Sequence, residues 1–141
     1  MTVRCEHCGT KNRVPGAAGG KPVCGNCHRP LPWIADAGDE DFTEVAERSS
    51  VPVLVDLWAA WCAPCRTVSP VLERIAHEMA GRLKLVKTDI DRAPRIRERF
   101  AVRAVPTLLL MRDGKVIDRR AGAAHAGPLR TWVEEALGRD T

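Results

Sequence analysis

Two cysteines, Cys62 and Cys65, lie between an apolar run and a helix-like segment, and this placement constrains the fold more than any other feature of the chain. The run at 51–58 reads V-P-V-L-V-D-L-W and is typical of a strand covered on both faces. A helix with one apolar stripe is predicted from about 62 to 80, with a kink at Pro70. A C-x-x-C pair at a strand-to-helix junction is typical of a redox motif.

The chemistry of this junction follows from the start of a helix. The first backbone N–H groups of a helix have no partner within it and carry partial positive charge, so they favour a thiolate over a thiol. Pro64 fits the first turn, where its missing N–H is not needed. The spacing also lets Cys65 reach Cys62, so the pair can close to a disulfide and reopen.

The remaining pattern predicts an α/β fold. Strand 51–58, the helix after it and a strand at 83–88 form a right-handed parallel unit. The turn residues Asp113 and Gly114 predict a hairpin. We expect a mixed sheet with helices on both faces, completed by helices at 39–48, at 93–100 and from 128, and by strands at 107–111 and 115–119.

The other four cysteines form two C-x-x-C pairs separated by 15 residues, the spacing of a zinc ribbon: Cys5, Cys8, Cys24 and Cys27. Four thiolates close a tetrahedral site and leave no position for a substrate, so a zinc ion here is structural. Two disulfides are the alternative interpretation. His7 and His28 are alternative ligands, although four cysteines already satisfy zinc.

The ribbon is predicted to be a separate unit over residues 1–33, with a second domain over 34–141. Two prolines at 30 and 32 make the connection extended and stiff. The first 33 residues contain few large apolar side chains, so zinc binding would supply the missing folding free energy.

The hydrophobicity pattern and the cysteines indicate the cellular compartment. No apolar stretch is long enough to cross a bilayer, and the N-terminus lacks the apolar core of a signal peptide. Together with six cysteines that suit reducing conditions, this predicts a cytoplasmic protein without a membrane partner.

The first 33 residues hold five Lys and Arg and one Glu, which accounts for the whole net charge of +4. Four zinc-bound thiolates reduce this to about +2, which is weak ground for nucleic-acid binding.

Residues from about 35 to 141 resemble the thioredoxin family along their whole length. The resemblance rests on V-D-L-W-A-A-W-C-A-P-C, V-K-T-D-I-D, V-P-T and D-G-K-V, in that order. The preceding ribbon is similar to the zinc-containing bacterial branch of the family. The resemblance implies a thioredoxin fold behind a zinc ribbon and the activity of a protein disulfide reductase. It also implies a monomer that reduces disulfide-containing proteins and is regenerated by a flavin- and NADPH-dependent thioredoxin reductase. No nucleotide fingerprint occurs in the chain, so neither nucleotide nor flavin is expected to bind.

The resemblance also implies roles for the redox residues. Cys62 would be the attacking thiolate and Cys65 the buried resolving thiol. Asp56 lies inside an apolar run, where a carboxylate titrates at raised pH, and it would relay a proton to or from Cys65. Lys87 matches the lysine that the family pairs with this carboxylate. An exposed strand lysine is the alternative for Lys87.

The substrate-binding residues are likewise implied by the resemblance. Pro106 would follow a cis peptide bond, which exposes the backbone of Val105 to an extended substrate segment. Gly122 would leave room for the substrate backbone, although a plain loop glycine explains it nearly as well.

The rim of the site is expected to come from the redox motif itself. Trp61 would form an exposed lip, and Ala63 and Pro64 would complete the surface that meets the substrate. Ala63 departs from the family, where glycine is usual, and its methyl group abuts the disulfide.

Two other functions remain open at this point. The chain could be a zinc-ribbon adaptor for nucleic acid or protein with secondary redox activity. It could also be a disulfide oxidase or isomerase, although the missing export signal disfavours this. The tethered thiolates further suggest that the ribbon senses oxidation.

Overall fold

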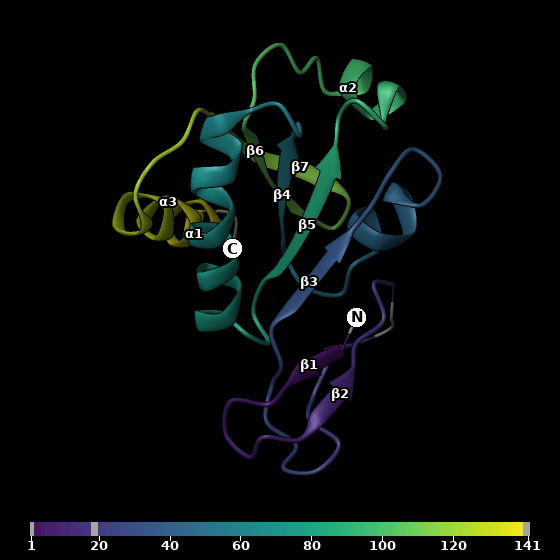
Figure 1. Ribbon diagram of the computed structural model, residues 1–141, viewed down its shortest axis with the longest axis vertical. Coiled ribbons are helices and arrows are strands. Elements are labelled where there is room, and N and C mark those ends of the chain that lie inside the picture. Colours follow the sequence, from purple (N-terminus) through teal and green to yellow (C-terminus); the bar gives the residue numbers. More distant parts are fainter. Residues whose placement is uncertain (1, 18–19, 140–141) are drawn as a thin grey trace.

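The computed structural model describes residues 2–17 and 20–139, which form a five-stranded mixed sheet with a small two-stranded unit beside it (Figure 1). The strand order is β3-β5-β4-β6-β7. Strands β3, β5 and β4 are parallel, and β6 and β7 continue the sheet antiparallel. The strand bounds are β3 Trp33–Asp36, β4 Val53–Trp58, β5 Lys84–Asp89, β6 Thr107–Arg112 and β7 Lys115–Ala121.

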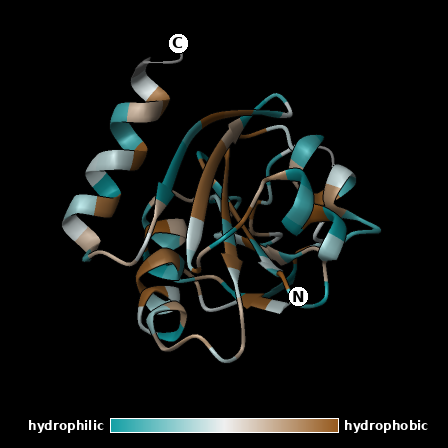
Figure 2. Ribbon diagram, turned by 90° about the horizontal axis from the view of Figure 1, so that it is seen from above, coloured by the Kyte–Doolittle hydropathy of each residue, from teal (hydrophilic) through white to brown (hydrophobic). Residues whose placement is uncertain are grey.

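Helices cover both faces of this sheet, so the predicted fold class is confirmed. Helices α1 (Ala63–Glu78) and α3 (Ala126–Arg139) pack on one face. The short helices η1 (Thr43–Glu47) and α2 (Pro94–Arg99) pack on the other. Figure 2 shows the hydrophobic residues concentrated in the strands between these layers.

Two predicted elements differ in the structure. The helix expected over 39–48 is reduced to the five-residue π-helix η1, which follows a turn closed by the bond from Phe42 N to Gly38 O. Helix α1 spans Ala63–Glu78, slightly shorter than the predicted 62–80, and includes Pro70, where the expected kink stays a prediction. Strand β3 was not predicted, because four residues after a proline give too short a pattern. Its burial alternates, with Trp33 and Ala35 facing inward.

The N-terminal unit is a hairpin of β1 (Thr2–Arg4) and β2 (Lys11–Arg13) followed by the second cysteine pair. Its apolar cluster includes Val14, Leu31 and Trp33 together with Val51, which directly precedes β4. Trp33 therefore belongs to the ribbon core and to the central sheet at once.

Polar contacts also join the ribbon to the sheet. Glu6 Oε1 lies 2.7 Å from His77 Nδ1 on α1. The fully buried Lys84 Nζ donates to the carbonyls of Gly16 in the ribbon and Val45 in η1, and it lies 3.9 Å from the Trp33 ring centroid. The division into domains 1–33 and 34–141 stays a prediction. Within the described ranges, every helix is too short or too polar to cross a bilayer.

Candidate active site and metal centre

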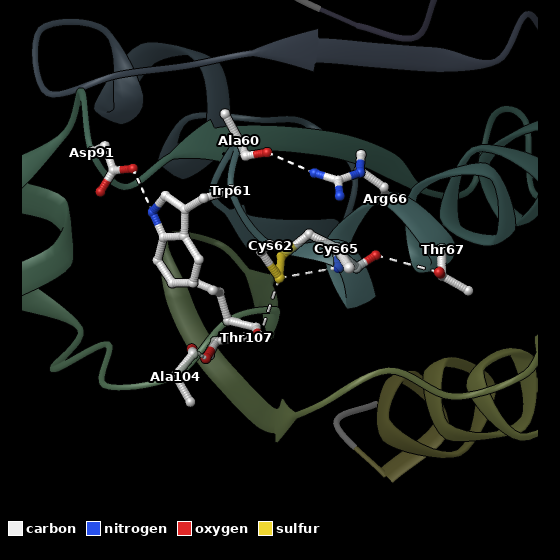
Figure 3. The surroundings of a disulfide bond; sticks show 11 residues. Ala60, Trp61, Cys62, Cys65, Arg66, Thr67, Asp91, Ala104 and Thr107 are labelled. Atoms are coloured by element: carbon white, nitrogen blue, oxygen red, sulfur yellow. Dashed lines mark hydrogen bonds between the residues drawn. A yellow bond between two sulfur atoms is a disulfide. The ribbon is translucent and has the colours of Figure 1, made fainter.

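The redox motif forms the start of α1. Cys62 is the N-cap residue, with extended backbone angles, and its Sγ accepts the N–H of Cys65 at 3.1 Å. Pro64 lies in the first turn, as predicted from its missing N–H. Cys62 and Cys65 are joined by a disulfide, and their Cα atoms lie 5.3 Å apart (Figure 3). The free N–H of Cys65 at the helix start is thus aimed at the Cys62 sulfur.

Exposure does not distinguish the two cysteines in this oxidised state. Cys62 is 4% exposed and Cys65 is 3% exposed, so both sulfurs are buried in the disulfide. The asymmetry lies in the hydrogen bonding, because the N–H of Cys65 points at the Cys62 sulfur. A thiolate would gain more from this donor at Cys62 than at Cys65.

Trp61 forms the lip of the site. Its side chain stands out as an exposed aromatic, 68% accessible. The indole Nε1 donates to Asp91 Oδ2 at 2.9 Å, which fixes the ring beside the disulfide (Figure 3). Ala63 and Pro64 are exposed next to it in the first turn of α1.

The Val105–Pro106 segment lies on the other side of the disulfide. The peptide bond between these residues is cis. Cys62 Sγ lies 3.6 Å from Val105 O. Once the disulfide is reduced, the Cys62 thiol can donate its S–H to this carbonyl oxygen. Gly122 N donates to Pro106 O at 2.9 Å, and Gly122 has φ +88°, a conformation that favours glycine. The structure thus brings Val105, Pro106 and Gly122 together next to Cys62.

Asp56 lies beneath α1 in the buried part of the site. It is 1% exposed, and its Oδ1 has no hydrogen-bond partner among the described residues. Burial raises the pKa of Asp56 to about 6, the Lys87 ammonium opposes this, and Glu73 adds to it. A cavity of about 230 Å³, lined by Asp56 and Cys65 among others, connects the two groups. It is large enough for water to carry a proton between them.

Lys87 is placed differently from what a simple pairing with Asp56 requires. The two residues are partners in the β4–β5 register. The contacts of Lys87 Nζ, however, are Ser69 Oγ at 2.5 Å and Glu73 Oε2 at 3.6 Å, both on α1. Across the described ranges, no ion pair within 4.0 Å joins Lys87 to Asp56.

The four N-terminal cysteines converge, as their spacing predicts: the Sγ atoms of Cys5, Cys8, Cys24 and Cys27 lie within 4.8 Å of one another. The Cys5–Cys27 and Cys8–Cys24 sulfur pairs lie 3.6 and 3.5 Å apart. A tetrahedral zinc site with Zn–S bonds of about 2.3 Å has sulfur–sulfur edges of about 3.8 Å. The residues therefore fit a metal ion held by four sulfurs.

Tight turns and hydrogen bonds surround the four thiols. The two knuckles turn at Gly9 (φ +77°) and His28 (φ +63°), whose N–H groups donate to Cys5 O and Cys24 O. In the second knuckle Gly25 donates its N–H to Asn12 Oδ1. Hydrogen bonds with the side chain and backbone of Thr10 lower the pKa of Cys8 to about 5, which favours the thiolate that a metal needs. The pKa of Cys27 shifts the other way: the backbone of Arg29 lowers it, but burial and the neighbouring cysteine sulfurs raise it to about 11.

Comparison with known proteins decides the family. The sequence model of the thioredoxin family matches residues 33–135. The chain is a member of the thioredoxin family. Thioredoxin from Acidithiobacillus ferridurans is 41% identical over 104 residues, which cover 74% of this chain and 96% of that protein. Thioredoxin from Haemophilus influenzae is 39% identical over 104 residues, covering 74% and 97%. The chain is accordingly a thioredoxin-type protein disulfide reductase.

One relative extends past the thioredoxin domain. Thioredoxin C-3 from Corynebacterium nephridii is 36% identical over 141 residues, covering 97% of this chain and 96% of that protein. An alignment of this extent must include most of the residues ahead of 33. The order of an N-terminal extension followed by a thioredoxin domain is therefore shared with this relative.

The structure adds residues that the sequence did not single out. Asp91 holds the Trp61 indole, and Arg66 Nη1 donates to Ala60 O at 2.8 Å beside the motif. Ser69 Oγ accepts a hydrogen bond from the Lys87 ammonium, and Glu73 forms an ion pair with it. The spacing of Ser69 and Glu73 was a weak signal, because residues four apart on a helix share one face. It did not identify Lys87 as their partner, because Lys87 lies on a strand 14 or more residues further along the chain.

Proposed function

We propose that this thioredoxin reduces disulfides in proteins, with Cys62 as the attacking thiolate and Cys65 as the resolving thiol. The observation that carries the proposal is the N–H of Cys65 donated to the Cys62 sulfur at the start of α1. Cys62 attacks one sulfur of the substrate disulfide, a mixed disulfide forms, and the second substrate sulfur leaves as a thiolate that takes a proton. Cys65 then attacks Cys62, which releases the first substrate thiol and forms the Cys62–Cys65 disulfide. Two electrons and two protons pass to the substrate.

The proton of Cys65 has an acceptor in Asp56. A carboxylate with a pKa of about 6 is close enough to neutral pH to accept a proton and return it. The cavity that both residues line offers the path. Lys87 tunes the carboxylate by its charge. Trp61, Ala63 and Pro64 on one side and Val105, Pro106 and Gly122 on the other bind the extended substrate segment.

The N-terminal unit is proposed to be a zinc ribbon, which places the chain with the bacterial proteins called thioredoxin-2. Cys5, Cys8, Cys24 and Cys27 would hold one structural Zn²⁺, which supplies a closed four-thiolate anchor for a unit with a small apolar core. We place the protein in the cytoplasm as a monomer, with a flavin- and NADPH-dependent thioredoxin reductase as its electron donor.

The same cysteines are proposed to sense oxidation. Peroxide would convert two thiolates to a disulfide with the release of water and the metal, and the Cys5–Cys27 and Cys8–Cys24 pairs are close enough for this. The neighbour of Cys5, Glu6, contacts His77 on α1, the helix that begins at the redox motif. Unchanged zinc content and unchanged reductase kinetics after mild peroxide treatment would contradict the sensor.

The test of the reductase uses two serine variants. Cys62→Ser should abolish the NADPH-coupled reduction of insulin, because no mixed disulfide can form. Cys65→Ser should form mixed disulfides that persist, and these would identify the substrate proteins by mass spectrometry. Normal insulin reduction by Cys62→Ser would refute the assignment.

A further inference from the structure

Three strands bring charged residues into one row under α1. Asp36 on β3 is the register partner of Lys87 on β5, and Lys87 is the partner of Asp56 on β4. Register partners point to the same side of a sheet, so the lysine stands between two aspartates. Asp36 and Asp56, together with Lys87, line the cavity that Cys65 also lines. On strand positions alone, Lys87 could neutralise either carboxylate.

Helix α1 decides between these possibilities by supplying other partners. Ser69 and Glu73 lie four residues apart on α1, one turn from each other on a single face. Lys87 Nζ contacts Ser69 Oγ at 2.5 Å and Glu73 Oε2 at 3.6 Å. Its side chain is 17% exposed, so the ammonium depends on these partners more than a surface lysine would.

The position of the Lys87 ammonium affects the carboxylate of Asp56. Its Oδ1 is buried and finds no hydrogen-bond partner in the described ranges. Glu73 acts on this carboxylate in two ways: its negative charge raises the pKa of Asp56 directly, and it holds the Lys87 cation, which already lowers that pKa and would lower it further from a closer position. The other charged neighbours of the cavity are Asp36 on β3 and Arg66 on α1, whose guanidinium is bound to Ala60 O.

We propose that Glu73, assisted by Ser69, is a positioning residue that holds the Lys87 ammonium on the α1 side of the cavity, so that Asp56 stays without an ion-pair partner and can exchange a proton with Cys65. The proposal rests on the proton-relay role given to Asp56 above. Glu73 itself touches neither substrate nor the reacting sulfurs. Its contribution is to prevent a direct Asp56–Lys87 ion pair that would lock the carboxylate in its charged form.

The test is the titration of the Asp56 carboxyl by carbon-detected NMR in the oxidised protein, where the redox cysteines do not titrate. Glu73→Gln should lower the Asp56 midpoint by about one pH unit or more, because it removes a like charge and releases an opposite one. Ser69→Ala should shift it in the same direction by less. In the Lys87→Met background, Glu73→Gln should have a clearly smaller effect, since the cation is no longer there to be released.

Glu78→Gln is the matched control. Glu78 lies on the same helix with the same side-chain exposure of 44%, and its partners are Arg74 and Arg130 rather than Lys87. This variant should leave the Asp56 midpoint unchanged. A Glu73→Gln shift no larger than that of Glu78→Gln, or a shift to higher pH, would overturn the proposal.

A second measurement separates this inference from the proposed function. The pH dependence of mixed-disulfide resolution should move to lower pH in Glu73→Gln and should lose its Asp56 limb in Asp56→Asn. If Asp56→Asn leaves the resolution profile unchanged while Glu73→Gln still shifts the Asp56 midpoint, the relay role fails and the positioning role of Glu73 stands. If Asp56→Asn removes the limb but Glu73→Gln shifts nothing, the relay stands and the positioning role fails.

Discussion

Replacing Asp56 by asparagine should make the protein more stable at neutral pH, although it removes a residue of the active site. The carboxylate is 1% exposed and lacks a partner for Oδ1, so its charged form is unfavourable in the folded state. The pKa of Asp56 rises from 3.8 to about 6 on folding, because burial outweighs the Lys87 charge. A rise of this size corresponds to about 3 kcal/mol at pH 7.5, which a neutral amide of the same shape avoids.

The sign and the pH window follow from proton binding. Between pH 3.8 and about 6 the folded state holds more protons at Asp56 than the unfolded state. The stability of the natural protein therefore falls as the pH rises through this window, while that of Asp56→Asn does not. The gain from the substitution should be about 3 kcal/mol at pH 7.5 and about 1 kcal/mol at pH 4.5.

Urea unfolding of the oxidised protein, followed by tryptophan fluorescence, measures this difference. With a urea slope of about 2 kcal/mol per molar, the midpoint should rise by about 1.5 M at pH 7.5. Asp36→Asn is the control, because Asp36 faces the same lysine across the sheet but is exposed, and its change should stay within about 0.5 kcal/mol. No gain at pH 7.5, or an equal gain at both pH values, would refute the reasoning.

Three further predictions concern the ribbon and its junction with the sheet. Trp33→Ala should cost about 3–5 kcal/mol in urea unfolding, because the indole is 1% exposed and belongs to two packed units. Burial lowers the pKa of Lys84 from 10.5 to about 8, so the free energy of unfolding should rise with pH between these two values. Lys84→Met should abolish this rise, which thermal unfolding of both proteins across the pH range would measure. Cys24→Ser should reduce bound zinc from one equivalent to near none in a metal assay while insulin reduction persists; a full equivalent of zinc in this variant would exclude the four-sulfur site.

The sequence determined the features that arise within a few residues of one another. The apolar run before Cys62 and the helix after it fix the redox pair at a helix start, because orphan amides occur at every helix N-terminus. Asp113 and Gly114 form the β6–β7 turn with φ +53° and +77°, as their residue types predict. The C-x-x-C spacing brings two sulfurs together within each local turn, whereas the Cys5–Cys27 and Cys8–Cys24 contacts join the two turns across 22 and 16 residues.

Only the tertiary structure decided the contacts that join distant segments. The family resemblance implies that Lys87 pairs with Asp56, yet the Lys87 ammonium contacts Ser69 and Glu73 on α1. Asp91 holds the Trp61 indole from 30 residues away, and Lys84 joins the ribbon to the sheet across 68. Long side chains have many rotamers of similar energy, so packing of the whole fold selects which partner each one meets.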